Sequence, residues 1–150
     1  MEGKYKGYYI YDNPKYQQQI NHDKTFFNIE ITEFSNGEFF GFVEDDIDTG
    51  GTPGKGIIKG EKNGNNVFFI KEMPIAAFII NGKLKTYKKK HPKIYYKGII
   101  TDNNIEGEWK IKSGFIMLGL SFLFGLKVSG TWMMENVESA KTLKTSPDYR

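Results

Sequence analysis

The segment from Ile105 to Lys112 alternates without exception between two kinds of residue. Ile105, Gly107, Trp109 and Ile111 are apolar or small, and the residues between them are glutamates and a lysine. Because successive side chains of a strand point to opposite faces, this pattern predicts a β-strand with one buried and one solvent-exposed face. The strand in turn predicts a sheet that covers a core on one side.

The run from Lys93 to Thr101 is expected to pair with this strand through a turn at Asn103-Asn104. With two turn residues, Gly98 falls opposite Trp109 on the buried face, whereas a three-residue loop would place Lys97 there. Asparagine also tolerates the positive φ that a type I′ turn requires. We therefore expect the indole of Trp109 to lie over the backbone of Gly98.

The pattern apolar-x-Gly-x-apolar recurs along the chain. Its copies are Tyr5-x-Gly7-x-Tyr9, Phe39-x-Gly41-x-Val43, Tyr96-x-Gly98-x-Ile100, Ile105-x-Gly107-x-Trp109 and Val128-x-Gly130-x-Trp132. Chance could place some of the 17 glycines at this spacing, but two copies share the longer form Ile/Val-x-Gly-x-Trp-x-Ile/Met. Glycine weakens a strand interior, so its recurrence there needs a structural reason. In a sheet that coils until it closes, glycines relieve crowding and let large aromatic side chains lie over them.

The hairpin within residues 26–45 is ambiguous. Asn36-Gly37 is a strong turn signal, and two turn residues would pair Ile31 with Phe42 and Ile29 with Glu44. Both faces carry apolar residues, so alternation does not decide which face is interior. If the face of Gly41 is interior, the same register also turns polar side chains inward, which suits a wet ligand cavity better than a packed core. Those side chains are Asn28, Glu30 and Thr32.

Composition agrees with a β fold, because the chain has 12 Phe and 9 Tyr but few alanines. The expected strands are Gly3 to Tyr11, Phe26 to Phe34, Glu38 to Asp45, Lys55 to Glu61, Val67 to Met73, Lys93 to Thr101, Ile105 to Lys112 and Lys127 to Glu135. Residues 75–80 fit either a short helix or a hairpin with residues 83–87. We predict an all-β fold, an antiparallel up-and-down barrel of about eight to ten strands. It should span residues 1–135 as one domain, with a flexible tail over 136–150.

Charge, apolar run length and cysteine content limit the kinds of partner and the cellular compartment that we expect for this chain. Seven of the 15 residues from Lys83 to Lys97 are lysines, yet Arg150 is the only arginine, so bidentate recognition of phosphate or guanine is not expected. We therefore expect no specific nucleic-acid partner.

The uncharged run from Ser113 to Leu126 is shorter than the ~20 residues of a membrane-spanning helix, which predicts no transmembrane segment. With no cysteine and no apolar segment near Met1, the chain is expected to be cytoplasmic.

The chain resembles the calycin-like barrels, the group that includes lipocalins, fatty-acid-binding proteins and avidins. The resemblance rests on Gly107-Glu108-Trp109, on Gly130-Thr131-Trp132 and on the glycine-marked aromatic strands. The chain is also similar to small uncharacterised bacterial proteins, through Phe39-x-Gly41-x-Val43-x-Asp45, Val67-x-Phe69-x-Lys71 and His91-Pro92-x-Ile94-x-Tyr96-x-Gly98. It is not a typical lipocalin, since lipocalins carry Gly-x-Trp on the first strand, where this chain has Gly7-Tyr8-Tyr9. The resemblance implies a barrel with room for one small ligand.

The polar residues form no recognisable catalytic or metal-binding pattern. The acidic loop from Glu44 to Gly51 fails as an EF-hand, because the fifth residue counted from Asp46 is Gly50 and the twelfth is Ile57. His22 and His91 lie in expected loops, and no Ser/His/Asp order suggests a catalytic triad. We therefore expect no catalytic residue, no metal site and no cofactor.

Three functions remain open from the sequence. The first is a noncatalytic barrel that binds a small, largely apolar ligand, with Tyr96, Trp109 and Trp132 among the lining residues, although plain core packing also explains these three. The second is an interaction module that self-associates through Phe115 to Leu126 or through the hairpin from Phe26 to Val43. The third is an enzyme that uses a buried carboxylate, Glu44, with a tyrosine inside the barrel.

Overall fold

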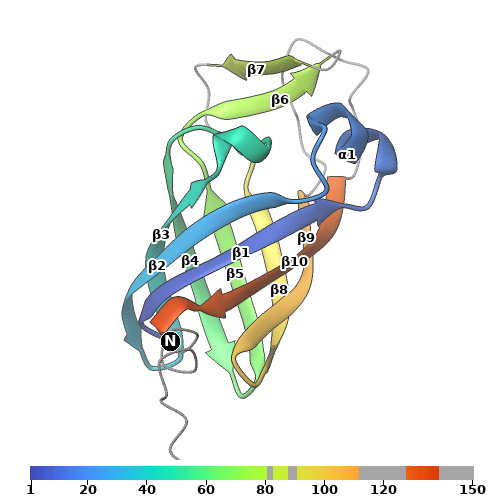
Figure 1. Ribbon diagram of the computed structural model, residues 1–150. Coiled ribbons are helices and arrows are strands. Elements are labelled where there is room, and N and C mark those ends of the chain that lie inside the picture. The colour runs from blue at the N-terminus through green and yellow to red at the C-terminus, as the bar shows by residue number, and fades with distance from the viewer. Residues whose placement is uncertain (81–82, 88–90, 112–127, 139–150) are drawn as a thin grey trace, which may run out of the picture.

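Eight strands close into an antiparallel barrel in the computed structural model, which describes residues 1–80, 83–87, 91–111 and 128–138 (Figure 1). The strands are β1 (Gly3–Tyr11), β2 (Thr25–Ser35), β3 (Glu38–Asp45), β4 (Lys55–Asn63), β5 (Asn66–Glu72), β8 (Ile94–Thr101), β9 (Asn104–Ile111) and β10 (Val128–Asn136). Their order around the barrel is β1-β10-β9-β8-β5-β4-β3-β2. Chain neighbours mostly pair with each other, and the β1–β10 pair closes the sheet. The all-β, up-and-down barrel predicted from the sequence is confirmed.

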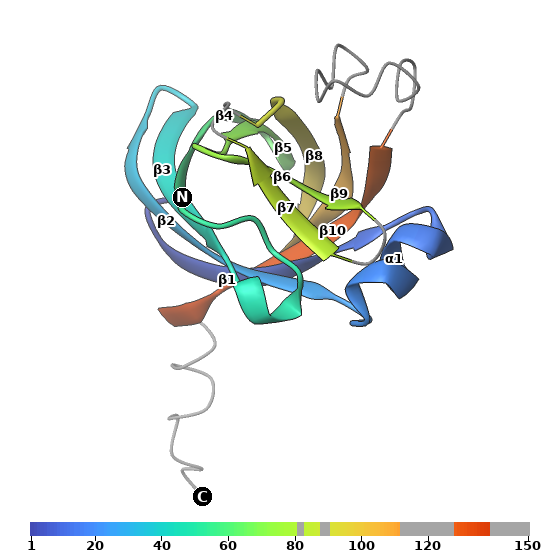
Figure 2. The same cartoon turned by 90° about the horizontal axis from the view of Figure 1, so that it is seen from above.

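Three smaller elements lie together at one end of the barrel, here called the capped end (Figure 2). They are the helix α1 (Pro14–Ile20), the short 3₁₀ helix η1 (Ile47–Thr49) and a separate hairpin of β6 (Ala76–Ile80) with β7 (Lys83–Tyr87). Residues 75–80 therefore contribute to a hairpin, and the alternative of a short helix there is wrong. Viewed along the barrel, this hairpin crosses over the mouth.

The helix α1 was missed by the sequence reasoning. Asn13 caps it, with its side chain accepting a hydrogen bond from the Lys15 backbone N–H at 3.0 Å, and Pro14 follows in the first turn. Asn21 ends it in the left-handed conformation at φ 57°. Asn-Pro is a helix-start signal, because asparagine caps well and proline lacks only an N–H that would be unpaired anyway.

Two predicted segments fall beyond the described structure. The apolar run between residues 113 and 126, and residues 139–150 of the expected tail, lie outside the described residues. Within the described ranges, no helix has the length and apolar character needed to cross a membrane.

The β8–β9 hairpin has the predicted faces but not the predicted register. Its turn is Asp102-Asn103 rather than Asn103-Asn104, with Thr101 paired to Asn104 and Asp102 at φ 52°. Aspartate tolerates this left-handed conformation nearly as well as asparagine. Gly98 consequently pairs with Gly107, and the predicted placement of Trp109 opposite Gly98 is wrong. A shift of two residues keeps every side chain on its expected face.

Each tryptophan does lie over a glycine, but Gly98 lies under Trp132 rather than under Trp109 as predicted. A Cβ on Gly98 would lie 2.6 Å from Cζ2 of Trp132, and one on Gly130 would lie 2.6 Å from Nε1 of Trp109. Each indole also donates hydrogen bonds to the backbone. Trp132 Nε1 lies 3.1 Å from the carbonyl oxygens of Lys97 and Glu108. The tryptophans therefore hold neighbouring strands together from within the core.

A β-bulge resolves the ambiguity of the β2–β3 hairpin. Ser35 pairs with Glu38 across the predicted Asn36-Gly37 turn, but the register shifts between Ile31 and Glu33, so that Ile31 pairs with Gly41. The predicted pairs Ile31–Phe42 and Ile29–Glu44 are therefore wrong. An extra residue in one strand reverses the phase of its side chains. As a result, the face of β2 that carries Ile31 and the face of β3 that carries Gly41 both turn inward. Asn28 and Glu30, on the other face of β2, are exposed.

The barrel interior is occupied by one continuous apolar cluster. It comprises Tyr5, Tyr9, Phe27, Ile29, Ile31, Phe39, Val43, Ile58, Val67, Phe69, Met73, Ile94, Tyr96, Ile105, Trp109, Ile111, Trp132 and Met134. At its centre, Phe69 and Tyr96 stack with ring centroids 4.5 Å apart, and Trp132 meets both rings edge-on. Such close aromatic packing is characteristic of a solid core.

The glycine–indole contact predicts a specific coupling between two substitutions. Trp132→Ala should lower the free energy of unfolding by about 3–5 kcal/mol. Gly98→Ala should lower it by about 1–3 kcal/mol, because the new methyl group would meet the ring. In the double variant the methyl group has room, so the loss should be smaller than the sum. Urea denaturation measures all three variants.

The matched control for this coupling is Gly98→Ala combined with Trp109→Ala. Trp109 lies over Gly130 rather than over Gly98, so this pair should show the weaker coupling. Stronger coupling of Gly98 to Trp109 than to Trp132 would contradict the observed register.

Candidate functional site

A buried ion pair lies inside the barrel at the capped end. Lys71, on β5, places its Nζ 2.5 Å from Oδ1 of Asp45, the last residue of β3, and the two side chains are only 2% and 1% exposed. Both strands alternate regularly, and both residues fall on the inward phase that Val43 and Phe69 also occupy. Removing two charges from water is costly even when they pair. A buried pair in an otherwise apolar interior therefore marks this place as a candidate site.

The loop after β3 shapes the carboxylate side of the site. The backbone N–H of Thr52 donates to Asp45 Oδ2 at 3.3 Å, and the Tyr9 hydroxyl donates to the same oxygen at 3.4 Å. The chain can return close enough for this contact because residue 51 is glycine, where a Cβ would come 2.5 Å from the Cβ of Asp45. Asp46 caps η1 by accepting a hydrogen bond from the Asp48 N–H. The acidic loop is thus a local turn that aims Asp45 inward.

Aromatic rings surround the ammonium side of the site. Lys71 Nζ lies 5.2 Å from the ring centroid of Tyr9 and 5.9 Å from that of Phe27. Both distances fall within the range of cation–π attraction, which is strongest where water is excluded. Lys71 is therefore held by one carboxylate and by ring faces.

Three tyrosines near the ion pair stay protonated at neutral pH. Burial, and next the charge of Asp45, raise the pKa of Tyr9 and of Tyr96 well above the usual value, and the same causes raise the pKa of Tyr11 to about 12. A phenol that keeps its proton can donate a hydrogen bond. These residues supply neutral donors rather than further negative charge.

His91 completes the site from the segment that precedes β8. It is 7% exposed, and its Nδ1 lies 2.7 Å from the Pro92 carbonyl oxygen. Burial lowers the pKa of His91, the hydrogen bond to Pro92 opposes this effect, and the charge of Lys71 lowers the pKa further. The imidazole is therefore neutral at pH 7, so Asp45 and Lys71 remain the charged members of the described site.

The structure places the residues predicted from the sequence in different environments. Glu44 is exposed on the outside of β3, and Asp45 beside it is the buried carboxylate, so the choice of Glu44 was wrong. Tyr96, Trp109 and Trp132 are all buried in the core cluster. Of these, Tyr96 has its pKa raised by burial and then by the charge of Asp45. Their role as ligand-lining residues stays a prediction.

The ion pair itself was missed, although the sequence carried a signal for it. Lys71 continues the inward phase of Val67-x-Phe69, and Asp45 shares the face of Phe39-x-Gly41-x-Val43. If the face of Gly41 is taken as interior, both are charged residues at core positions. Lysine and aspartate are almost never fully buried unless paired. Two residues of opposite charge at core positions are therefore expected to form an ion pair with each other.

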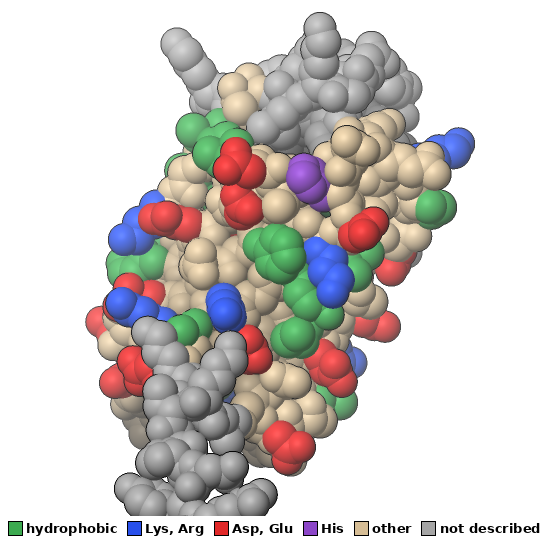
Figure 3. Space-filling model, viewed as in Figure 1, with side chains coloured by type: hydrophobic (Ala, Val, Ile, Leu, Met, Phe, Trp, Pro, Cys, Tyr) green, Lys and Arg blue, Asp and Glu red, His purple; other side chains and the backbone are tan. Residues whose placement is uncertain are grey.

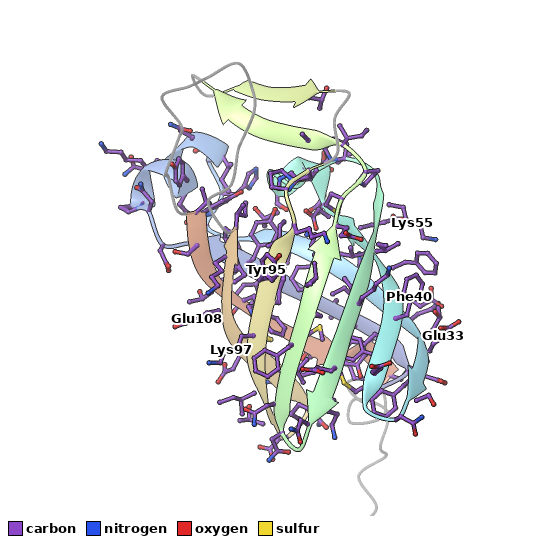
Figure 4. The ribbon with its side chains drawn as sticks, turned by 180° about the vertical axis from the view of Figure 1, so that it is seen from behind. Glu33, Phe40, Lys55, Tyr95, Lys97 and Glu108 are labelled. Atoms are coloured by element: carbon purple, nitrogen blue, oxygen red, sulfur yellow. The ribbon has the colours of Figure 1, made fainter. Side chains whose placement is uncertain are left out.

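A groove of about 1060 Å³ lies away from the ion pair, and its lining includes the core residues Tyr96 and Trp109 as well as outward side chains. Among these, Phe40, Tyr95, Lys97, Glu33 and Glu108 all point outward (Figure 4). Lys97 pairs across strands with Glu108, which balances charge along the surface. The groove offers aromatic surface without a buried polar group.

The opposite outer face carries a small apolar patch. Phe26 is 49% exposed and meets the ring of Tyr8 edge-on, with Lys24 Nζ 4.1 Å from the centroid of Tyr8. Figure 3 shows hydrophobic and basic side chains together on this face. Phe26 belongs to the hairpin considered for self-association, which stays a prediction. Among the described residues, no three acidic or histidine side chains gather in a group that could hold a metal ion.

Removing one member of the ion pair should be more harmful than removing both. Lys71→Met leaves a buried carboxylate unpaired and should lower the free energy of unfolding by about 3–5 kcal/mol. Asp45→Asn combined with Lys71→Met keeps an acceptor for Tyr9 and Thr52 and should recover most of that loss. Urea denaturation of the three proteins measures the difference. If the double variant is as unstable as Lys71→Met, the ion pair itself contributes that free energy of unfolding, which would contradict this prediction.

The buried histidine predicts a dependence of stability on pH. Because the pKa of His91 is lowered in the folded state, the unfolded chain binds a proton more readily below about pH 6.5, and acidification favours unfolding. The free energy of unfolding should fall between pH 7 and 5, and more steeply in the wild type than in His91→Gln. Equal slopes in urea titrations would show that His91 is not responsible. His22→Gln, at an exposed position, is the matched control.

No family model, curated protein or solved structure matches this chain. The site is therefore interpreted from its own geometry. That geometry combines a charge-balanced ion pair, neutral tyrosine donors and aromatic walls at the capped end of a β-barrel.

Proposed function

We propose that this protein is a noncatalytic small-molecule-binding barrel of calycin-like architecture, whose ligand contacts the Asp45–Lys71 pair at the capped end. The observation that carries the proposal is the complete burial of this ion pair within an apolar interior. Buried ion pairs are weak contributors to stability. The neighbouring Tyr9, Tyr96 and His91 have shifted pKa values, and such groups concentrate at functional sites. A structural role alone would be served as well by apolar residues of similar volume.

The position of the ligand follows from how the barrel is filled. The stacked rings of Phe69 and Tyr96, with Trp132 packed against them, occupy the middle of the interior. The capped end instead combines polar groups with ring faces and is covered by short elements and loops. Ligand sites characteristically have apolar walls with a few converging polar groups. We place the ligand at the capped end. Tyr96 would bound the ligand on the side towards the middle of the barrel, and Trp109 and Trp132 would support the wall of the site.

An enzymatic function is the second candidate, and Asp45 is the observation that favours it. It is a buried carboxylate within hydrogen-bonding distance of a tyrosine hydroxyl, the arrangement that the sequence reasoning sought at Glu44. However, Lys71, Thr52 and Tyr9 already occupy the oxygens of Asp45. A general base needs a free oxygen directed at the proton it removes. Binding without catalysis therefore fits the geometry better.

Native mass spectrometry of freshly purified protein tests the proposal. The wild type should carry a noncovalent adduct of small-molecule mass, and Asp45→Asn/Lys71→Met should lose it while remaining folded. The matched control, Lys59→Met, removes an exposed lysine from the outer groove and should keep the adduct. A wild type without any adduct, or a double variant that retains it, would contradict a site at the ion pair.

A further inference from the structure

The ammonium group of Lys71 has unused hydrogen-bonding capacity. An ammonium carries three N–H donors, and within the described part of the chain its hydrogen bond goes to Asp45 Oδ1 alone. The neighbouring groups are the faces of Tyr9 and Phe27, which attract the charge but accept hydrogen bonds poorly. Lys71 is thus a nearly fully buried donor for which Asp45 is the one hydrogen-bond acceptor among the described residues.

Asp45 offers the complementary group. Its Oδ2 receives only long hydrogen bonds, 3.3 Å from Thr52 N–H and 3.4 Å from the Tyr9 hydroxyl. Hydrogen bonds from such neutral donors are usually shorter, about 2.7–3.2 Å for N–H···O and about 2.5–3.0 Å for O–H···O. A ligand donor that replaces one of these two long bonds can therefore approach this oxygen more closely. The pair presents one donor and one acceptor side by side.

The net charge of the site limits the charge of its ligand. Asp45 and Lys71 cancel, the neighbouring tyrosines are protonated, and His91 is neutral. A carboxylate or an ammonium entering here would bring an uncompensated charge into an apolar, buried site, which is strongly unfavourable. A neutral ligand adds no charge and can bond to both members of the pair.

We propose that the ligand is a neutral aromatic or cyclic molecule with an adjacent hydrogen-bond acceptor and donor, such as a primary amide or lactam, which binds Lys71 through its acceptor and Asp45 through its donor. This inference rests on the proposed function and specifies its ligand class. It differs from a site for free carboxylates, in which a buried cation would lack a permanent counter-ion.

Four probes that share one ring and differ in their polar group test the ligand class. They are benzamide, benzoate, benzylammonium and toluene. The backbone N–H of Thr52 bonds to Asp45 and so reports directly on the site. In ¹⁵N–¹H titrations at pH 7, benzamide should shift the Thr52 resonance. It should bind about tenfold or more tightly than the other three, since hydrogen bonds to charged groups carry that much discrimination.

The outcomes separate the ligand class from the site. If benzoate or benzylammonium binds as tightly as benzamide, the neutral class is overturned while the site stands. If no probe shifts the Thr52 resonance, both the class and the proposed site are overturned. Asp45→Asn/Lys71→Met is the control, and an undiminished benzamide response in it would also overturn both. Lys59→Met should respond as the wild type does.

Discussion

The structure depends on closure of the sheet through the pairing of β1 with β10. A closed barrel leaves no unpaired strand edge, so the backbone of each strand is satisfied on both sides. Trp109 reinforces this pairing from within, since its Nε1 donates to the carbonyl oxygens of Ile10 on β1 and Thr131 on β10. Gly130 allows that indole to lie against the backbone. Large rings that lie over residues without a side chain thus stabilise the closed barrel.

Closure also creates the environment of the candidate site. Asp45 and Lys71 lie on β3 and β5, which are separated by β4, and they meet across the curved interior rather than through strand pairing. Apolar walls exclude water, which strengthens the attraction within the pair and raises the penalty for any unmatched charge. The same walls keep the tyrosines protonated and His91 neutral. Charge balance at the capped end is therefore a consequence of the barrel's closure.

Much of the fold could be predicted from the sequence because a half-buried strand has a simple period. Alternation located β9 and assigned the faces of β8, and Asn36-Gly37 located the turn between β2 and β3. Local exceptions to the period were not predictable. The bulge near Thr32 and the turn at Asp102 each changed a register, since several turns of similar energy fit the same residues. The helix α1 was missed because its capping signal resembled a strand end.

The sequence by itself determined the closed β architecture and the alternation of each regular strand, which placed Lys71 on the same face as Phe69 and Asp45 on the same face as Val43. It did so because alternation depends only on the local geometry of an extended chain. Only the tertiary structure decided which inward residues meet. The bulge brought Ile31 and Gly41 to the same interior, Gly98 on β8 received Trp132 from β10 across the intervening β9, and Asp45 met a lysine 26 positions away. Contacts across a barrel depend on its curvature and closure, which arise from all the strands together.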